Sequence, residues 1–340
     1  MKPGTITFAL VALFSIRAWA QGPEQIQKND VTAILARDAA IDAHLVKARE
    51  AAGFDFTGTL ARLCVAPARF PLVVRDAAPN AQVPARNTWY IDPAKIFDNL
   101  YFVGSKIHNS WALVSSEGII ILDTLFTYNS EEEIVGGLKK LGLDPLQVKY
   151  VIITHAHADH VGGAKLLQDL SHAKIVMGAP DWDSIERSVN GYPAGKPKRD
   201  ITADDGQKIT LGGTSVTVVT TPGHTPGTLS MIFNVKDNGK PLTVVYSGGT
   251  AFNFPSTGPN FDIYARSQAK LAAAAAAAGA TVFLSNHSEF DNAVAKIRMI
   301  ASRKPGEPHP FEIGKEAIAR YFILGQECAA AAKLRFSDAP

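Results

Sequence analysis

The sequence predicts a mixed α/β protein in which two β-sheets pack face to face and helices cover their outer faces. Short apolar runs with strand character alternate with helical patterns from Asn99 onward, and meanders of strands occur in both halves of that region. With 46% hydrophobic and 19% charged residues, the 340-residue chain has enough apolar material for a packed core, which excludes disorder for most of it. The pattern alone would equally allow a doubly wound sheet. The motifs therefore have to decide between the two architectures.

Residues 1–20 are typical of a secretory signal peptide. Lys2 provides a positive start, an apolar stretch runs from Ile6 to Ile16, and Ala18-Trp19-Ala20 has the small-x-small form of a cleavage site. The apolar stretch is much shorter than the ~20 residues that a membrane-spanning helix needs. We therefore expect cleavage after Ala20, a periplasmic or secreted protein, and no membrane contact once the signal is removed.

Residues 21–93 are predicted to form an N-terminal helical extension. Asp30 can cap a helix that ends near Gly53 and carries apolar residues on roughly one face, namely Val31, Ile34, Leu35, Ile41 and Leu45. Proline-rich, irregular chain follows as far as Pro93. This part of the sequence indicates no chemistry.

Residues 94–340 contain the predicted sheets and end in a helix. Strands are expected over 100–103, 112–115, 119–122, 148–153, 174–177, 208–211, 216–220, 229–235, 242–246 and 281–284. Asn238-Gly239 is the turn of a hairpin between two of them. Ser130, with Glu133 three residues on, is expected to cap a helix. Further helices are expected over 164–170, 262–279, 289–302 and 311–333.

The distribution of charged residues argues against nucleic acid as a binding partner. The chain has 34 Lys plus Arg and 32 Asp plus Glu, and the basic residues are scattered along the sequence.

The two cysteines, Cys64 and Cys328, can form a disulfide in an oxidising compartment. The alternative is two separately buried thiols. Neither has a second cysteine nearby, so a cysteine metal site is excluded.

The stretch 154–163, Thr-His-Ala-His-Ala-Asp-His-Val-Gly-Gly, is the most informative part of the sequence. Four potential metal ligands follow an apolar strand directly: His155, His157, Asp159 and His160. His155 and His157 alternate along extended chain, so both can point the same way. The turn after them lets Asp159 and His160 point to a second centre close by.

Two further histidines have similar settings. His224 follows a strand in a loop with two Pro-Gly steps, and His287 follows the strand predicted over 281–284. Six ligand-capable residues could therefore serve two metal ions, and imidazoles with one carboxylate suit zinc. The remaining histidines, His44, His108, His172 and His309, are interpreted as structural or surface residues, with His108 and Trp111 as weak candidates for a loop near the site.

These motifs resemble the metallo-β-lactamase superfamily over roughly 97–300. The resemblance implies an αββα sandwich, with a two-zinc site along one edge, and an enzyme that acts on a small molecule. It also suggests that Asp123, at the end of a strand, supports the metal loop from behind; the alternative is an ordinary turn residue. The bridging aspartate of many members is missing, because the chain has Ser247-Gly248-Gly249-Thr250-Ala251 after the strand at 242–246.

Without a bridging aspartate, the set of predicted metal ligands resembles that of the subclass B3 metallo-β-lactamases. The resemblance then implies His155, His157 and His224 on the first zinc, and Asp159, His160 and His287 on the second. A zinc-bound hydroxide, oriented by Asp159 as the catalytic residue, would open the β-lactam ring in the periplasm. Candidate substrate contacts are Ser247, Thr250 and Asn253.

Two other functions stay open. Serines that contact the drug carboxylate in subclass B3 are replaced by Gly249 and Ala251, so a lactonase or another hydrolase of cyclic esters or amides is the alternative. A non-catalytic zinc-binding protein is the third reading. The segment Asp181 to Arg199, with Trp182, Tyr192 and Lys196, is a candidate for the pocket wall.

Overall fold

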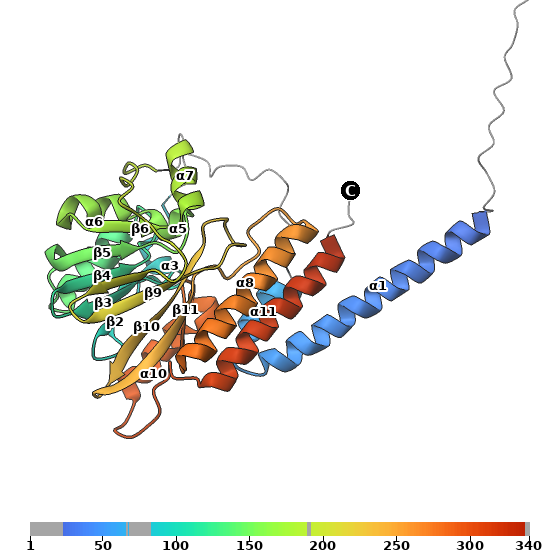
Figure 1. Ribbon diagram of the computed structural model, residues 1–340. Coiled ribbons are helices and arrows are strands. Elements are labelled where there is room, and N and C mark those ends of the chain that lie inside the picture. The colour runs from blue at the N-terminus through green and yellow to red at the C-terminus, as the bar shows by residue number, and fades with distance from the viewer. Residues whose placement is uncertain (1–22, 66, 68–82, 189–191, 337–340) are drawn as a thin grey trace, which may run out of the picture. The chain divides into compact units, whose positions relative to one another are not determined.

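The computed structural model describes residues 23–65, 67, 83–188 and 192–336 (Figure 1). The expected signal peptide, residues 1–20, lies outside the described residues. The Cα positions divide the chain into two units, 1–40 and 41–340. None of the described helices is long and apolar enough to cross a membrane.

The N-terminal helix α1 spans Pro23–Ala52, so the expected start at Asp30 is wrong. Good helix formers precede Asp30, and proline is tolerated in the first turn, so nothing in that stretch interrupts the helix. Its end is as predicted, because Gly53 has a positive φ of 52°. Short helical segments follow: α2 at Thr57–Leu60, a π-helical turn at Ala61–Val65 and α3 at Arg86–Trp89.

The first sheet has seven strands in chain order. It begins with antiparallel pairs from β1 to β4 and continues with parallel pairs from β4 to β7. The strands are β1 Ala94–Lys95, β2 Leu100–Phe102, β3 Trp111–Ser115, β4 Gly118–Leu122, β5 Val148–Ile152, β6 Lys174–Met177 and β7 Ile201–Thr202. The two-residue strands β1 and β7 were not predicted, since they are too short to show a period.

The second sheet has five strands in the order β12-β11-β10-β9-β8, of which only β11 and β12 pair in parallel. They are β8 Lys208–Leu211, β9 Thr214–Thr220, β10 Leu229–Asp237, β11 Lys240–Ser247 and β12 Val282–Ser285. Asn238 and Gly239 both have positive φ, 51° and 81°, which confirms the predicted hairpin turn between β10 and β11. The predicted strand ends differ from the observed ones by at most two residues.

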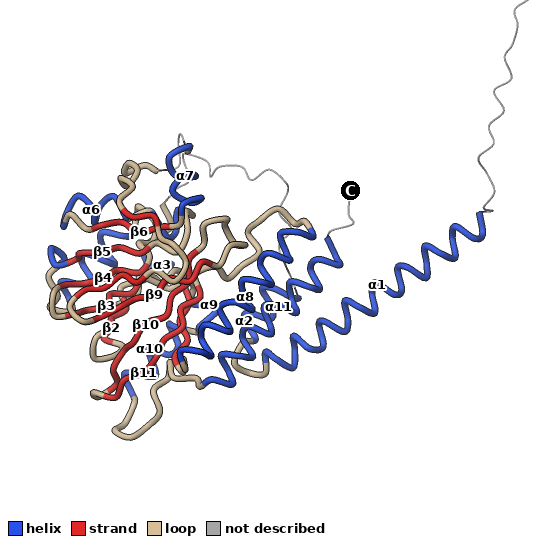
Figure 2. Tube along the Cα trace, viewed as in Figure 1, coloured by secondary structure: helices blue, strands red, loops and turns tan. Residues whose placement is uncertain are grey.

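Side chains from both sheets form a shared core between them, which includes Phe102, Trp111, Met231 and Phe233. The other face of the seven-stranded sheet packs against α4 (Gly136–Lys140), α6 (Ala164–Ser171) and α7 (Ala179–Arg187). The other face of the five-stranded sheet packs against α8 (Gly258–Ala278) and α11 (Lys315–Phe336) (Figure 2). The αββα layering is therefore confirmed, and the doubly wound alternative is excluded.

Several helix predictions are wrong in detail, including the start of α8, which lies at Gly258 rather than at residue 262. Ser130 does not cap a helix, because its own backbone is already helical and no cap hydrogen bond forms; a π-helical turn at Glu131–Val135 precedes α4. The expected helix over 289–302 is divided into α9 (Ser288–Asp291) and α10 (Ala293–Ser302) by Asn292 in the left-handed conformation. The last helix, α11, begins at Lys315 rather than at residue 311.

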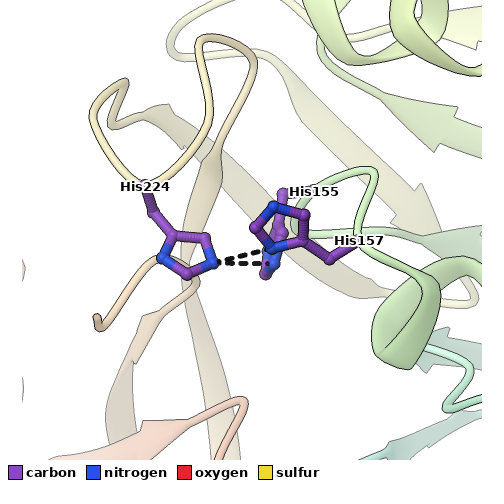
Figure 3. A group of neighbouring side chains, drawn as sticks. All are labelled: His155, His157 and His224. Carbon is purple, nitrogen blue, oxygen red and sulfur yellow. Dashed lines mark hydrogen bonds between the residues drawn. The ribbon is translucent and has the colours of Figure 1, made fainter. Parts of the chain in front are cut away.

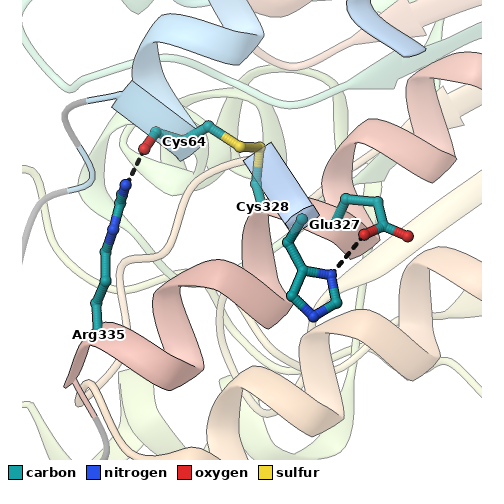
Figure 4. Close-up of a disulfide and its surroundings, with 5 residues drawn as sticks. Cys64, Glu327, Cys328 and Arg335 are labelled. Atoms are coloured by element: carbon teal, nitrogen blue, oxygen red, sulfur yellow. Dashed lines mark hydrogen bonds and ion pairs between the residues drawn. A yellow bond between two sulfur atoms is a disulfide. The ribbon is translucent and has the colours of Figure 1, made fainter. Parts of the chain in front are cut away.

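Cys64 and Cys328 form a disulfide (Figure 4). It joins the π-helical turn at Ala61–Val65 to α11, and both cysteines are completely buried in the core that α8 and α11 share with the five-stranded sheet. Arg335 donates a 2.6 Å hydrogen bond to the backbone oxygen of Cys64 beside the bridge. The alternative of two separate thiols is therefore wrong.

Candidate metal centre

The predicted ligands meet at the carboxyl ends of strands from both sheets. His155 and His157 follow β5, and the short helix α5 (Ala158–Val161) carries Asp159 and His160. Two more loops complete the cluster: the one between β9 and β10 holds His224, and the residue after β12 is His287. Because the two sheets pack face to face over one core, loops from both sheets come within reach of one another.

A first group consists of three imidazoles. Nε2 of His224 lies 3.0 Å from Nε2 of His155 and 3.1 Å from Nδ1 of His157 (Figure 3). A tetrahedral zinc ion with bonds of about 2.0–2.1 Å separates its nitrogen ligands by about 3.3–3.4 Å. The spacing and the type of these three donors therefore fit zinc.

The tautomers of two of these histidines can be assigned from their hydrogen bonds. Nδ1 of His224 lies 2.7 Å from the carbonyl oxygen of Ala251, and Nδ1 of His155 lies 3.1 Å from that of Gly248. A carbonyl oxygen only accepts, so both Nδ1 atoms carry the hydrogen and both Nε2 atoms present lone pairs. Two lone pairs that face each other at 3.0 Å repel unless a cation lies between them.

A second group surrounds the carboxylate of Asp159. Its Oδ2 lies 3.1 Å from Nε2 of His160, 3.5 Å from Nε2 of His287 and 3.4 Å from Nε2 of His108. The Nε2 atoms of His160 and His287 are themselves 3.1 Å apart. The structure thus brings together all six predicted ligands and adds His108, which the sequence indicated only weakly.

The protonation of the imidazoles differs between the two groups. Burial lowers the pKa of His155 well below its usual value and that of His224 to about 3, so the first group is uncharged and its lone pairs are free. Burial on its own would lower the pKa of His160, but Asp159 and Asp123 outweigh it and raise it to about 10. Burial lowers the pKa of His108 to about 4 and that of His287 well below its usual value, so His160 is the one imidazole of the second group that carries a charge, paired with the carboxylates of Asp159 and Asp123.

Asp123 supports the metal loop from behind, in the place where the sequence suggested it. Its Oδ1 accepts a 2.7 Å hydrogen bond from the backbone N–H of Thr154, and its Oδ2 accepts from the Thr154 hydroxyl at 2.8 Å and from Nδ1 of His160 at 3.0 Å. The carboxylate is fully buried. It fixes the tautomer of His160, so that Nε2 points to Asp159 and His287.

Asp181, at the start of α7, is a supporting residue that the sequence did not single out. Its Oδ2 accepts hydrogen bonds from the backbone N–H of Ala156 at 2.8 Å and from the Thr225 hydroxyl at 2.7 Å, and its Oδ1 accepts from the N–H of Gly227 at 2.9 Å. Ala156 separates two ligands of the first group, and Thr225 follows the third. One buried carboxylate thus connects both loops of the first group.

A cavity of about 640 Å³ opens beside the first group. Its walls include His157 and His224, together with Tyr192, Asn253, Phe254 and Ile263. Among the described residues that line it there is no lysine or arginine. Of the predicted substrate contacts, only Asn253 lines this cavity; Ser247 and Thr250 are buried and are not part of its wall.

Other predicted residues lie elsewhere. From the segment 181–199, Tyr192 lines the cavity, whereas Trp182 is buried under β7 and Lys196 donates to the backbone oxygen of Glu186. Trp111 begins β3 inside the core, so its placement in a loop near the site is wrong. His44 pairs with Glu327, His309 stacks on Phe97, and His172 ends α6.

No bridging carboxylate follows β11. An added Cβ at Gly248 would lie 1.8 Å from the backbone oxygen of Leu229, so that position accepts only glycine. The carbonyl of Gly248 instead receives the hydrogen bond from Nδ1 of His155. This residue therefore orients a ligand through its backbone.

Comparison with known proteins shows which proteins share this fold. Residues 103–237 match the model of the metallo-beta-lactamase superfamily, a superfamily of metal-dependent hydrolases, and the chain has the fold of that superfamily. A solved subclass B3 metallo-beta-lactamase of Bradyrhizobium japonicum is similar at 28% identity and a TM-score of 0.57, over 68% of this chain and 89% of that one.

Curated relatives match over shorter stretches. A hydroxyacylglutathione hydrolase of Pseudomonas putida is 33% identical over 102 residues, which are 30% of this chain and 33% of the relative. An N-acyl homoserine lactonase of a Bacillus species is 28% identical over 133 residues, 38% of this chain and 50% of the relative. The match thus spans between a third and a half of the length of these two curated relatives.

Proposed function

We propose that the protein is an exported hydrolase that holds two zinc ions and opens the ring of β-lactams. The observation that carries the metal part is the pair of Nε2 lone pairs of His155 and His224, 3.0 Å apart. The similarity to a solved subclass B3 enzyme supports the substrate class. The signal-like residues 1–20 and the disulfide support export to the periplasm.

Each of the two groups of residues would hold one zinc ion. His155, His157 and His224 would hold one zinc ion, and Asp159, His160 and His287 the other. When bound, such ions lower the pKa of a water molecule and polarise a carbonyl group near neutral pH.

The chain's own side chains orient and receive the reactants. Asp159, whose carboxylate belongs to the second group, would accept a proton from the attacking water and orient that water. Asp123 keeps His160 in one tautomer, and Asp181 holds the two loops of the first group at a fixed distance. The cavity next to His157 and His224 receives the substrate, with Asn253 as a hydrogen-bonding group on its wall.

A second substrate class is favoured by the cavity itself. A β-lactam antibiotic carries a carboxylate, but the described lining offers no lysine or arginine to pair with it, whereas Phe254 and Ile263 offer apolar surface. These features suit an uncharged cyclic ester with an apolar acyl chain. The match to an N-acyl homoserine lactonase points in the same direction.

The experiment compares substrates on zinc-loaded protein. A penicillin, a cephalosporin, a carbapenem and an N-acyl homoserine lactone are incubated separately, and ring opening is followed by absorbance or by acid release. Opening of any of the three drugs supports the lead proposal. Opening of the lactone alone replaces it with the second. Two bound zinc ions without any turnover would identify a non-catalytic zinc-binding protein.

A further inference from the structure

We propose that His108 is a fourth protein ligand of the cation held by Asp159, His160 and His287. This inference rests on the proposed function, since it concerns the second of the two zinc ions. Nε2 of His108 lies 3.4 Å from Oδ2 of Asp159, close to the spacing of about 3.3–3.4 Å between ligands of one tetrahedral zinc ion. The ligand atoms of His108, Asp159 and His287 all lie within 4.8 Å of one another.

One oxygen atom is the common neighbour of three imidazoles. Oδ2 of Asp159 lies 3.1–3.5 Å from Nε2 of His108, His160 and His287. The ligand atoms that lie within 4.8 Å of one another are those of His108, Asp159 and His287, so a cation bound by these three and by His160 has to draw His108 and His160 together. Without a cation, three ring nitrogens compete for the same acceptor.

The backbone holds His108 in this place. The loop between β2 and β3 forms an isolated antiparallel bridge in which His108 pairs with His287. Asn109 donates its backbone N–H to the oxygen of Asn286 at 2.9 Å, and Ser288 donates to the oxygen of Ile107 at 2.8 Å. The position of the His108 backbone is therefore set by the residues on both sides of another ligand.

The imidazole ring of His108 is also fixed. It packs edge to face against Phe126, with ring centroids 5.0 Å apart, and its side chain is 16% exposed. A ring that is mostly buried, packed on one side and aimed at a carboxylate on the other has the features of a preorganised ligand. A surface histidine would have none of them.

The number of protein ligands at the second cation also favours a role for His108. The chain lacks a carboxylate after β11, where Ser247-Gly248-Gly249 stands, so the second cation would otherwise have three protein ligands. Four protein ligands close a zinc site, whereas three leave an open position. The cavity is lined by His157 and His224 but not by Asp159, His160 or His287, which agrees with an open first site and a closed second one.

The test is a titration of the full-length, metal-free protein with Co²⁺, whose visible absorption reports coordination. The variant His108→Phe keeps a ring against Phe126 but removes both nitrogens, and His172→Asn is the control for loss of a histidine outside the site. We expect the first equivalent to bind as in the wild type. The second should bind at least tenfold more weakly in His108→Phe, with a changed spectrum, and unchanged in His172→Asn.

A second measurement does not depend on how the variant folds. In the wild type with two Co²⁺ bound, each histidine ligand gives one shifted imidazole N–H signal in the proton NMR spectrum, and six are expected. Five signals, or a second binding step that is the same in folded His108→Phe and the wild type, would overturn the role of His108 and leave the proposed function intact. A wild type that takes up fewer than two ions contradicts the two-zinc proposal itself.

Discussion

The carboxylate of Asp181 and the hydroxyl of Thr225 form a hydrogen bond of 2.7 Å, which ties α7 to the loop that carries His224. The same oxygen accepts from the N–H of Ala156, between His155 and His157. All three partners of this carboxylate are donors that converge on two oxygens, and burial raises its pKa while these hydrogen bonds lower it in part.

From this we predict that Asp181→Asn weakens metal binding without unfolding the protein. The amide nitrogen must face a donor, either Gly227 or the pair Ala156 and Thr225, so at least one loop loses its anchor. Loss of such an outer partner typically costs about 10–100-fold in metal affinity. Calorimetric titration with Zn²⁺ measures the change. Asp183→Asn, an exposed carboxylate on the same helix, should bind zinc like the wild type.

A second prediction concerns the first group directly. His157→Ala removes one of three imidazoles, so it should abolish nearly all turnover and lower the zinc content after dialysis. Elemental analysis and the substrate assay check both effects on the same sample. Full zinc content with normal activity in this variant would show that His157 is not a ligand.

A third prediction is a pH dependence of stability that comes from Glu133. Burial raises the pKa of this carboxyl to about 8 from its usual 4.5, and a 3.3 Å hydrogen bond from the N–H of Ile91, together with the charges of Arg86 and Lys140, compensates only in part. The folded state therefore binds a proton that the unfolded state releases between these two values. The contribution of Glu133 to the free energy of unfolding is therefore most favourable below pH 4.5. As the pH rises toward 8, the free energy of unfolding falls by up to about 1.4 kcal/mol per pH unit.

The variant Glu133→Gln should flatten that slope, because a neutral amide replaces a carboxyl that stays neutral in the fold. Urea unfolding at pH 5, 6, 7 and 8 gives the free energy of unfolding at each pH. Glu131→Gln, which changes an exposed carboxylate two residues earlier, should leave the slope as it is. Parallel curves for wild type and Glu133→Gln would contradict the raised pKa.

A fourth prediction concerns the disulfide. Replacing both cysteines by serine should lower the free energy of unfolding by about 2–4 kcal/mol, mainly because the unfolded chain gains freedom. Thermal unfolding of the double variant beside the oxidised wild type measures the loss. If thiol titration of the unfolded, exported wild type finds two free thiols, the bridge is absent from the protein.

The sequence was sufficient for most of the strands and for six candidate ligands, because both depend on local patterns, whereas the choice of the αββα layers over a doubly wound sheet came from the resemblance to the metallo-β-lactamase superfamily. Strand periodicity predicted the sheets, and the spacing of His155, His157, Asp159 and His160 within one short stretch indicated a metal centre. His224 and His287 could be added because each follows a strand end.

The remaining parts depend on contacts between distant residues. Asp181 has no local signal, since an aspartate in the first turn of a helix is common; its role arises only when three donors from two other loops reach it. His108 likewise needs the bridge to His287, 179 residues later, to come near Asp159. The start of α1 was missed because Asp30 is a good cap residue and also tolerable inside a helix.

The disulfide has a consequence for the order of events during biosynthesis. Cys64 precedes its partner by 264 residues, so the bridge can close only after Cys328 of α11 has been translated. Both sheets and all the histidine loops precede that helix in the chain. They can therefore assemble from noncovalent contacts before the bridge closes, and oxidation then fixes α11 on a sandwich that is already formed.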